Sequence, residues 1–456
     1  MYFRCFVALL IMLRIILFVY FVETKGEAYS ADSYLYLHLA DNICKHLVFS
    51  RDTLPPFTPE VFRTPGYPVF LAILKLLGVP GPYGTAAVQE IIYLACVMSF
   101  LRYGRIVFAQ KIVWAATIFL LLEPGGLAYP KEIFAEVLFL PGLLGGLLAI
   151  AYYLRQQQLR YLLLAACLMG IGALVRPVIF YLPLLIAVVL LAFAASERKR
   201  WVHVGLFLLT FVLVISPWLG RNYYYFNKVV MSGQQSNMFA YYHVPLVLQA
   251  AEGKTFKQGR DFMLEQVARA EKQQAKVLDR PLNFVEKFKL EQQLAFAELA
   301  KYPQQYAKQW LYGIIKTMVS ANLLELNHVL RLPIESLSFY AGESQGFTGR
   351  VVSFMQNPNR LYVALVCFRL LVAGFAVLGM IKILKGRDCF LWIMLLANLY
   401  FIGTPGPMGY ARFRFPMEVF WFIQALLGWQ WLMGMFGHGK QRAVATWVFL
   451  TKSMKS

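Results

Sequence analysis

Residues 30–41 read Ser-Ala-Asp-Ser-Tyr-Leu-Tyr-Leu-His-Leu-Ala-Asp and directly follow the first hydrophobic segment of the chain. Leu35, Leu39, Ile43 and Leu47 recur at every fourth position, which predicts a helix with one apolar side that lies on a bilayer surface. Asp32 stands at the start of this helix. Two interpretations of Asp32 stay open, a general base that faces a lipid-borne substrate and a cap of the helix N-terminus.

The composition around this stretch is that of a polytopic membrane protein. Of the 456 residues, 59% are hydrophobic and 15% are charged, whereas soluble domains have about 25% charged residues. The net charge of +20 comes largely from basic residues in short links between hydrophobic segments. This is the positive-inside pattern, so we expect contact with membrane lipids and no nucleic acid partner. The six cysteines follow no disulfide or zinc spacing.

Hydrophobic segments and basic links together predict the topology. We expect about ten spans, within a range of about eight to twelve, and an uncleaved first span. They lie near 5–22, 86–101, 112–122, 133–153, 161–174, 178–195, 202–218, 361–381, 390–402 and 417–435. Basic links such as 102–111, 155–160 and 198–200 are expected in the cytoplasm, which leaves the first loop, 23–85, on the exported side.

Three regions follow from this topology. Residues 1–220 form an N-terminal transmembrane module, 221–330 a small helical extracytoplasmic insert with an interfacial helix, and 331–456 the last transmembrane helices and a basic cytoplasmic tail. Residues 69–77 are too few to cross a bilayer and are expected at its interface. Residues 309–324 are amphipathic and are expected to be interfacial or re-entrant, and residues 279–281 to form a turn.

Common catalytic motifs do not occur in the sequence, which has no GxGxxG, P-loop, HExxH or GxSxG. Charged residues instead gather at the exported ends of the predicted spans, where charge normally faces a cavity or a partner. A set of arginines opposite carboxylates suits one task, to hold a phosphate while a carboxylate takes a proton. The candidates are Asp32, Arg63, Lys131, Glu132, Glu136, Arg176, Arg221, Arg412 and Arg414, with Tyr410 in the same segment as the last two.

Each candidate also has a simpler interpretation. An arginine at a span end can be an interfacial anchor, most strongly Arg221, which borders an aromatic belt. Lys131 and Glu132 can pair with each other. Arg176 lies between two apolar segments with almost no loop, and Glu136 lies about one turn inside its span, so anchoring explains these two less well.

The order of sequence features resembles the GT-C superfamily of integral-membrane glycosyltransferases, specifically the bacterial relatives of the protein O-mannosyltransferases and the lipid A aminoarabinose transferases. The resemblance covers nearly the whole chain and depends on seven motifs in matching order. They read ADSYLYLHLADNI, RTPGYPVFLA, AEVLFLPGLL, GIGALVRPVIFYLP, SPWLGRNYYYF, AKYPQQY and ARFRFP.

The resemblance implies an all-α polytopic fold and a site on the extracytoplasmic face of the bacterial inner membrane. It implies inverting transfer of a sugar from a polyprenyl-phosphate donor to a lipid, glycan or protein acceptor. Asp32 would be the catalytic base, and Lys131, Arg176 or Arg412 would hold the phosphate. Several members have a second acid after the first-loop Asp, where this chain has Ser33. Metal dependence varies across the superfamily, so a divalent cation stays open, and the sequence offers no clear ligand set.

Two other classes of function remain as alternatives. A transporter or flippase of lipid-linked oligosaccharides would also have many spans and cavity arginines, but the charges here collect on one face and no repeated halves are evident. A polysaccharide polymerase or O-antigen ligase is chemically close but normally lacks an acidic base after the first span.

Overall fold

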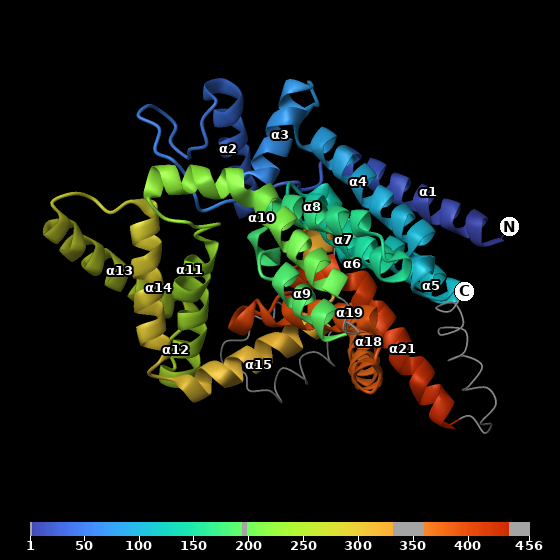
Figure 1. The fold of residues 1–456 in the computed structure, drawn as a ribbon. Coiled ribbons are helices and arrows are strands. Elements are labelled where there is room, and N and C mark those ends of the chain that lie inside the picture. Colours follow the sequence, from blue (N-terminus) through green and yellow to red (C-terminus); the bar gives the residue numbers. More distant parts are fainter. Residues whose placement is uncertain (1, 194–197, 332–359, 437–456) are drawn as a thin grey trace.

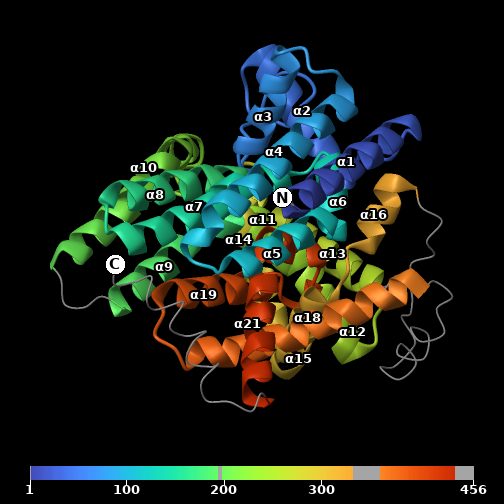
Figure 2. The same cartoon turned by 90° about the vertical axis from the view of Figure 1, so that its right-hand side faces the viewer.

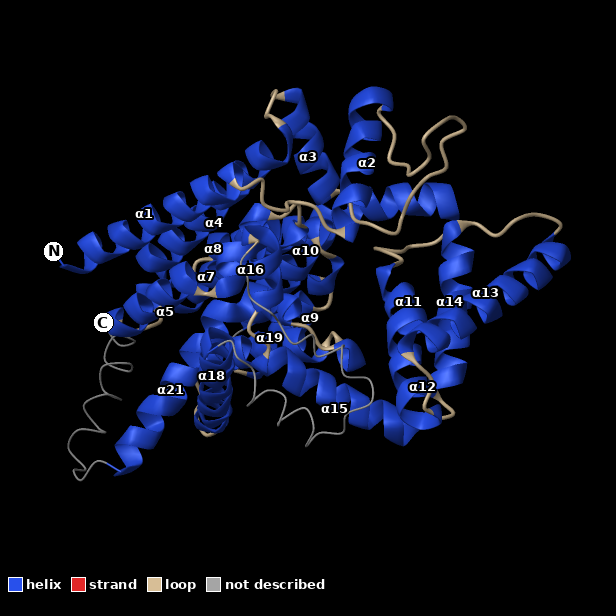
Figure 3. Ribbon diagram, turned by 180° about the vertical axis from the view of Figure 1, so that it is seen from behind, coloured by secondary structure: helices blue, strands red, loops and turns tan. Residues whose placement is uncertain are grey.

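The computed structural model describes residues 2–193, 198–331 and 360–436. Regular structure in these residues is helical throughout, with no strand, and Figure 3 shows helices joined by loops, the longest following α2. The predicted all-α membrane fold is therefore confirmed.

Five helices are long and apolar enough to cross a membrane, and the bent pair α5 and α6 would add a sixth span. The five are α1 (Tyr2–Glu23), α4 (Gly81–Tyr103), α7 (Ala135–Gln156), α10 (Arg198–Phe226) and α18 (Arg360–Leu384). The pair consists of α5 (Gln110–Leu122) and α6 (Pro124–Ala128) and is followed by η2 (Tyr129–Lys131). The chain bends by 55° at this break, where Pro124 has no N–H to continue the first helix.

The other predicted spans are also helical. They are α8 (Leu159–Val175), α9 (Leu182–Ala192), α19 (Cys389–Gly403) and α21 (Glu418–Phe436), and η3 (Pro177–Ile179) lies between α8 and α9. Helices α8, α9 and α19 are shorter than a typical full span. The total of about ten spans thus stays a prediction, although each predicted segment contains a helix.

Helix α7 lies at the centre of the bundle, and most of its side chains are buried (Figure 1). It packs against α8 through glycines, since a Cβ atom at Gly142 would lie 2.8 Å from the Cα of Gly172. Small residues of this kind allow membrane helices to approach closely. In Figure 2, α18 and α21 lie together below α5. Helix α21 contacts both α18 and α5.

Helices α2 (Ala31–His46) and α3 (Gly66–Leu76) pack together at one end of the bundle (Figure 1). The buried side of α2 contains Tyr36 and Ala40, and the Tyr36 ring meets that of Tyr67 at 4.8 Å. Leu39 of the predicted apolar stripe is buried within the protein rather than on a lipid-facing surface, whereas Leu47, the C-cap of the helix, is 90% exposed. Aromatic contacts with α3, rather than leucine spacing, set the orientation of α2.

The insert is a group of helices beside the bundle, with an apolar core of its own. It contains α11 (Gln234–Met238), η4 (Phe239–His243), α12 (Val244–Glu252), α13 (Phe256–Leu278) and α14 (Phe284–Leu299). The predicted turn at 279–281 is confirmed, since α13 ends at Leu278 and Asp279 has a φ of 50°. Residues 309–324 fall in α15 (Pro303–Val319) and the start of α16 (Leu323–Leu330). Whether they are interfacial stays a prediction, as do the three domain boundaries.

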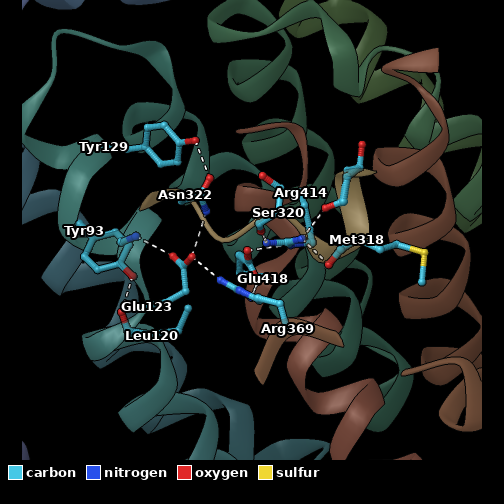
Figure 4. A network of polar contacts seen from close by, with 12 residues as sticks. Tyr93, Leu120, Glu123, Tyr129, Met318, Ser320, Asn322, Arg369, Arg414 and Glu418 are labelled. Carbon is cyan, nitrogen blue, oxygen red and sulfur yellow. Dashed lines mark hydrogen bonds and ion pairs between the residues drawn. The ribbon is translucent and has the colours of Figure 1, made fainter. Parts of the chain in front are cut away.

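A buried network of charges ties α15, α18 and α21 to the α5–α6 break (Figure 4). Arg369 pairs with Glu123 and, at 3.0 Å, with Glu418. Arg414 belongs to the short helix α20 (Ala411–Arg414), which follows η5 (Gly406–Met408) and precedes η6 (Phe415–Met417). It pairs with Glu418 at 2.8 Å and donates to the carbonyls at the end of α15, including those of Met318 at 2.6 Å and Ser320 at 2.8 Å.

Replacement of Arg414 by methionine is expected to destabilise the fold by about 3–5 kcal/mol, because it leaves buried carbonyls and part of a buried carboxylate without a partner. The measurement is the thermal unfolding midpoint of the purified protein in detergent. Arg269→Met is the matched control, since Arg269 forms an exposed pair with Glu265 on α13 and should matter little. Equal midpoints for the two variants would contradict the structural role of Arg414.

Candidate functional site

Asp32 lies in the first turn of α2 but does not cap it. The N-cap is Ser30, whose backbone N–H donates to the Ser33 hydroxyl at 2.9 Å. Ser33 in turn donates to the carbonyl of Ile133 at 3.0 Å, which fixes the start of α2 beside the start of α7. The capping interpretation of Asp32 is therefore wrong, and its carboxylate is directed toward two arginines.

Three arginines and two carboxylates form one continuous chain of ion pairs. Asp32 pairs with Arg63 at 2.5 Å and with Arg412 at 3.0 Å. Arg412 also pairs with Glu136, and Glu136 pairs with Arg176 at 2.7 Å. We call these five residues the arginine–carboxylate cluster. Its formal charge is +1, because three arginines share two carboxylates.

A buried helix end and two aromatic residues support the cluster. Glu136 is fully buried in the first turn of α7. The Arg412 guanidinium lies 4.0 Å from the centre of the Phe134 ring, and Arg63 donates to the Tyr36 hydroxyl at 3.2 Å. Stacking of this kind restricts an arginine without neutralising it. Asp32 is the most exposed member, with 30% of its side chain accessible, so an incoming molecule meets this end of the cluster.

The electrostatics of the cluster favour full ionisation. Burial alone would raise the pKa of Asp32, but Arg412 and Arg63 outweigh burial and lower this pKa to about 2. Burial opposes the charge of Arg412, yet Glu136 and Asp32 hold its pKa well above the usual range. Without a substrate, Asp32 is thus a charged but weakly basic carboxylate.

Lys131 lies outside the cluster. Its ammonium donates to the carbonyl of Leu127 at 2.8 Å and lies 3.5 Å from Glu90, which also pairs with Arg14 at 2.6 Å. The predicted Lys131–Glu132 pair is wrong. The 3-10 helix η2 ends at Lys131 and the backbone of Glu132 is extended, so the two side chains do not meet.

Arg221 and Arg414 also lie outside the cluster. Arg221 donates to the carbonyl of Glu60 at 2.6 Å and stacks on the Trp218 ring at 4.9 Å, so it holds the backbone of the first loop. The hydrogen bonds of Arg414 to other described residues belong to the buried network of Figure 4. These contacts are structural, and the substrate contact predicted for both residues stays a prediction.

Glu325 is a polar residue of this region that was missed in the sequence. It lies in α16, is buried, and accepts a hydrogen bond from Tyr410. The sequence signal for Glu325 is an acidic residue within a short, largely apolar segment, LLELNHVL. Among the described residues, no three His, Cys, Asp or Glu side chains lie close enough together to hold a metal ion.

Comparison with known proteins gives one family match. Residues 63–220, less than half of the chain, match the model of the dolichyl-phosphate-mannose-protein mannosyltransferase family. The matched stretch contains Arg63, Glu136 and Arg176 but neither Asp32 nor Arg412. A search of curated proteins finds no match.

Several solved structures are similar in fold. The oligosaccharyltransferase AglB from Archaeoglobus fulgidus, in complex with an inhibitory peptide and a dolichol-phosphate, has a TM-score of 0.48 and 12% identity over 98% of this chain and 54% of its own. ArnT from Cupriavidus metallidurans, bound to undecaprenyl phosphate, has a TM-score of 0.40 and 14% identity over 92% of this chain and 77% of its own. The chain spans about half the length of AglB.

Proposed function

Since residues 63–220 match the model of the dolichyl-phosphate-mannose-protein mannosyltransferase family, we propose that the chain is a GT-C type membrane glycosyltransferase that transfers a sugar from a polyprenyl-phosphate donor to an acceptor. The proposed site is the arginine–carboxylate cluster, on the extracytoplasmic face of the bacterial inner membrane. The acceptor is a hydroxyl or amine of a lipid, glycan or protein, and the transfer inverts the anomeric carbon.

The observation that carries this proposal is the net formal charge of +1 of the cluster. Three arginines share two carboxylates, and a phosphate would supply the missing negative charge. Arginine binds phosphate through two N–H groups of its planar fork. Arg412 and Arg176 are the proposed phosphate ligands, because both contact Glu136 and can share a second anion beside it.

The same geometry couples donor binding to the strength of the base. A phosphate that binds Arg412 competes with Asp32 for this guanidinium, so the pKa of Asp32 rises and its carboxylate becomes more basic. Asp32 then takes the proton of the acceptor while the acceptor atom bonds to C1 of the sugar. The C1–oxygen bond breaks, and the phosphate leaves with the electron pair, stabilised by Arg412 and Arg176.

The test is transfer by the purified protein in liposomes, with labelled polyprenyl-phosphate mannose and a cell-envelope fraction as acceptor. We expect labelled product, and we expect the acid limb of kcat to lie at higher pH than that of kcat/KM. The reason is that kcat/KM reports the free enzyme, in which the pKa of Asp32 is about 2, and kcat reports the donor complex. Failure to label any envelope acceptor would overturn the proposal.

A further inference from the structure

Glu132 is a buried carboxyl group without a partner. It lies in the extended link between η2 and α7, is 2% exposed, and its Oε1 atom is buried without a hydrogen bond. The described part of the chain offers this carboxyl neither a hydrogen bond nor an ion pair. A buried polar group without a partner is costly, which indicates that the missing partner comes from a bound molecule.

The surroundings place Glu132 beside the cluster. The backbone N–H of Phe134, whose ring supports Arg412, donates to the Glu132 carbonyl at 2.8 Å. Glu325 and Arg412 are both charged neighbours of Glu132. Glu325 accepts a hydrogen bond from Tyr410, which lies two residues before Arg412 in the sequence. Glu132, Glu325 and Tyr410 therefore gather on the Arg412 side of the cluster.

The chemistry of these three groups favours hydroxyl groups over a cation. Burial, and then the charge of Glu325, raise the pKa of Glu132 well above its ordinary value, because both disfavour its charged form. Burial and Glu325 likewise raise the pKa of Tyr410. Two carboxyl groups and a phenol together offer donors and acceptors of hydrogen bonds, which matches the hydroxyl groups of a sugar.

We propose that Glu132, Glu325 and Tyr410 form the subsite for the hydroxyl groups of the donor sugar. The inference rests on the proposed function, since it takes the phosphate of the donor to bind Arg412. A sugar is joined to this phosphate through one oxygen atom, so its ring lies directly beside Arg412. The three side chains next to Arg412 are then the determinants of which sugar is accepted.

Two probes separate the sugar from the phosphate. Binding of polyprenyl phosphate and of polyprenyl-phosphate mannose to the purified protein is measured by calorimetry in detergent. The wild-type protein should bind the mannose-bearing probe more tightly. Glu132→Ala and Glu325→Ala should each weaken binding of this probe by about tenfold or more, with no change for polyprenyl phosphate. Glu132→Gln should retain part of the affinity, because an amide still bonds to hydroxyl groups.

Glu291→Ala is the matched control. Glu291 is also a buried carboxyl that accepts a hydrogen bond from a tyrosine, Tyr241, at 3.0 Å, but it lies in the insert. It should alter neither affinity. Should an alanine variant fail to fold, Tyr410→Phe removes only one hydroxyl and should show the same selective loss.

Three outcomes are distinct. No binding of polyprenyl phosphate to the wild-type protein would refute the proposed function itself. Binding of polyprenyl phosphate without any gain from the attached mannose would overturn the subsite alone. Equal changes for both probes, or none, in the variants of Glu132, Glu325 and Tyr410 would overturn it as well.

Discussion

Asp32→Asn is expected to lower kcat by about 10²–10⁴-fold, the usual contribution of a general base. Asparagine keeps the shape of the side chain but cannot accept the proton of the acceptor. The substitution also removes one of the two negative charges of the cluster, so its formal charge changes from +1 to +2. Binding of polyprenyl phosphate should therefore be retained or become tighter. Transfer rate and binding are measured on the same preparation.

The matched control is Asp41→Asn on the same helix. Asp41 forms an exposed ion pair with Lys75 at 2.5 Å and has no ion pair with the cluster. Its variant should therefore transfer at the wild-type rate. Wild-type transfer by the Asp32 variant would remove Asp32 as the base. Loss of phosphate binding together with transfer would show that Asp32 only supports the fold of the site.

Arg412→Met is expected to lower kcat/KM for the donor by about 10³-fold or more. Arg412 joins both carboxylates of the cluster, and it is the proposed ligand of the phosphate in the ground state and in the transition state, where removal of one such donor alone costs about 10²–10³-fold. Arg412→Lys should recover only part of the activity, because an ammonium lacks the planar fork that contacts Asp32 and Glu136 together. Initial rates over a range of donor concentrations test this.

The control for Arg412 is an arginine that also stacks on an aromatic ring but lies outside the cluster. Arg160 also stacks on an aromatic ring, that of Tyr161 at 4.9 Å, but it is exposed at the opposite end of α8 from Arg176. Arg160→Met should leave the donor kinetics unchanged. If Arg412→Met has near-normal kcat/KM, or if its only defect is a lowered unfolding midpoint, Arg412 does not bind the donor.

Sequence alone predicted the main members of the cluster. Its members are charged residues at the ends of apolar segments, and such residues usually pair with one another. They are Asp32, Arg63, Glu136, Arg176 and Arg412. The convergence of Asp32, Arg412 and, through Glu136, Arg176 is what the structure shows.

The sequence could not separate these residues from structural charges. Arg414 donates hydrogen bonds to backbone carbonyls at the end of α15, and Arg221 donates to those of the first loop. Lys131 forms an ion pair with Glu90 on α4. Carbonyl acceptors have no signature in a sequence, and the pairing of Lys131 depends on the bend between α5 and α6. Glu325 could not be found from the sequence, because its hydrogen-bond donor, Tyr410, lies 85 residues further along the chain.

The cluster draws Asp32 from near the beginning of the chain and Arg412 from near its end. Since synthesis runs from the N-terminus, every other member of the cluster is made before Arg412. Until then Glu136 lacks one of its two cationic partners, and the proposed site is incomplete. The proposed enzyme thus becomes competent only after the segment that contains Arg412 has folded against α2 and α7.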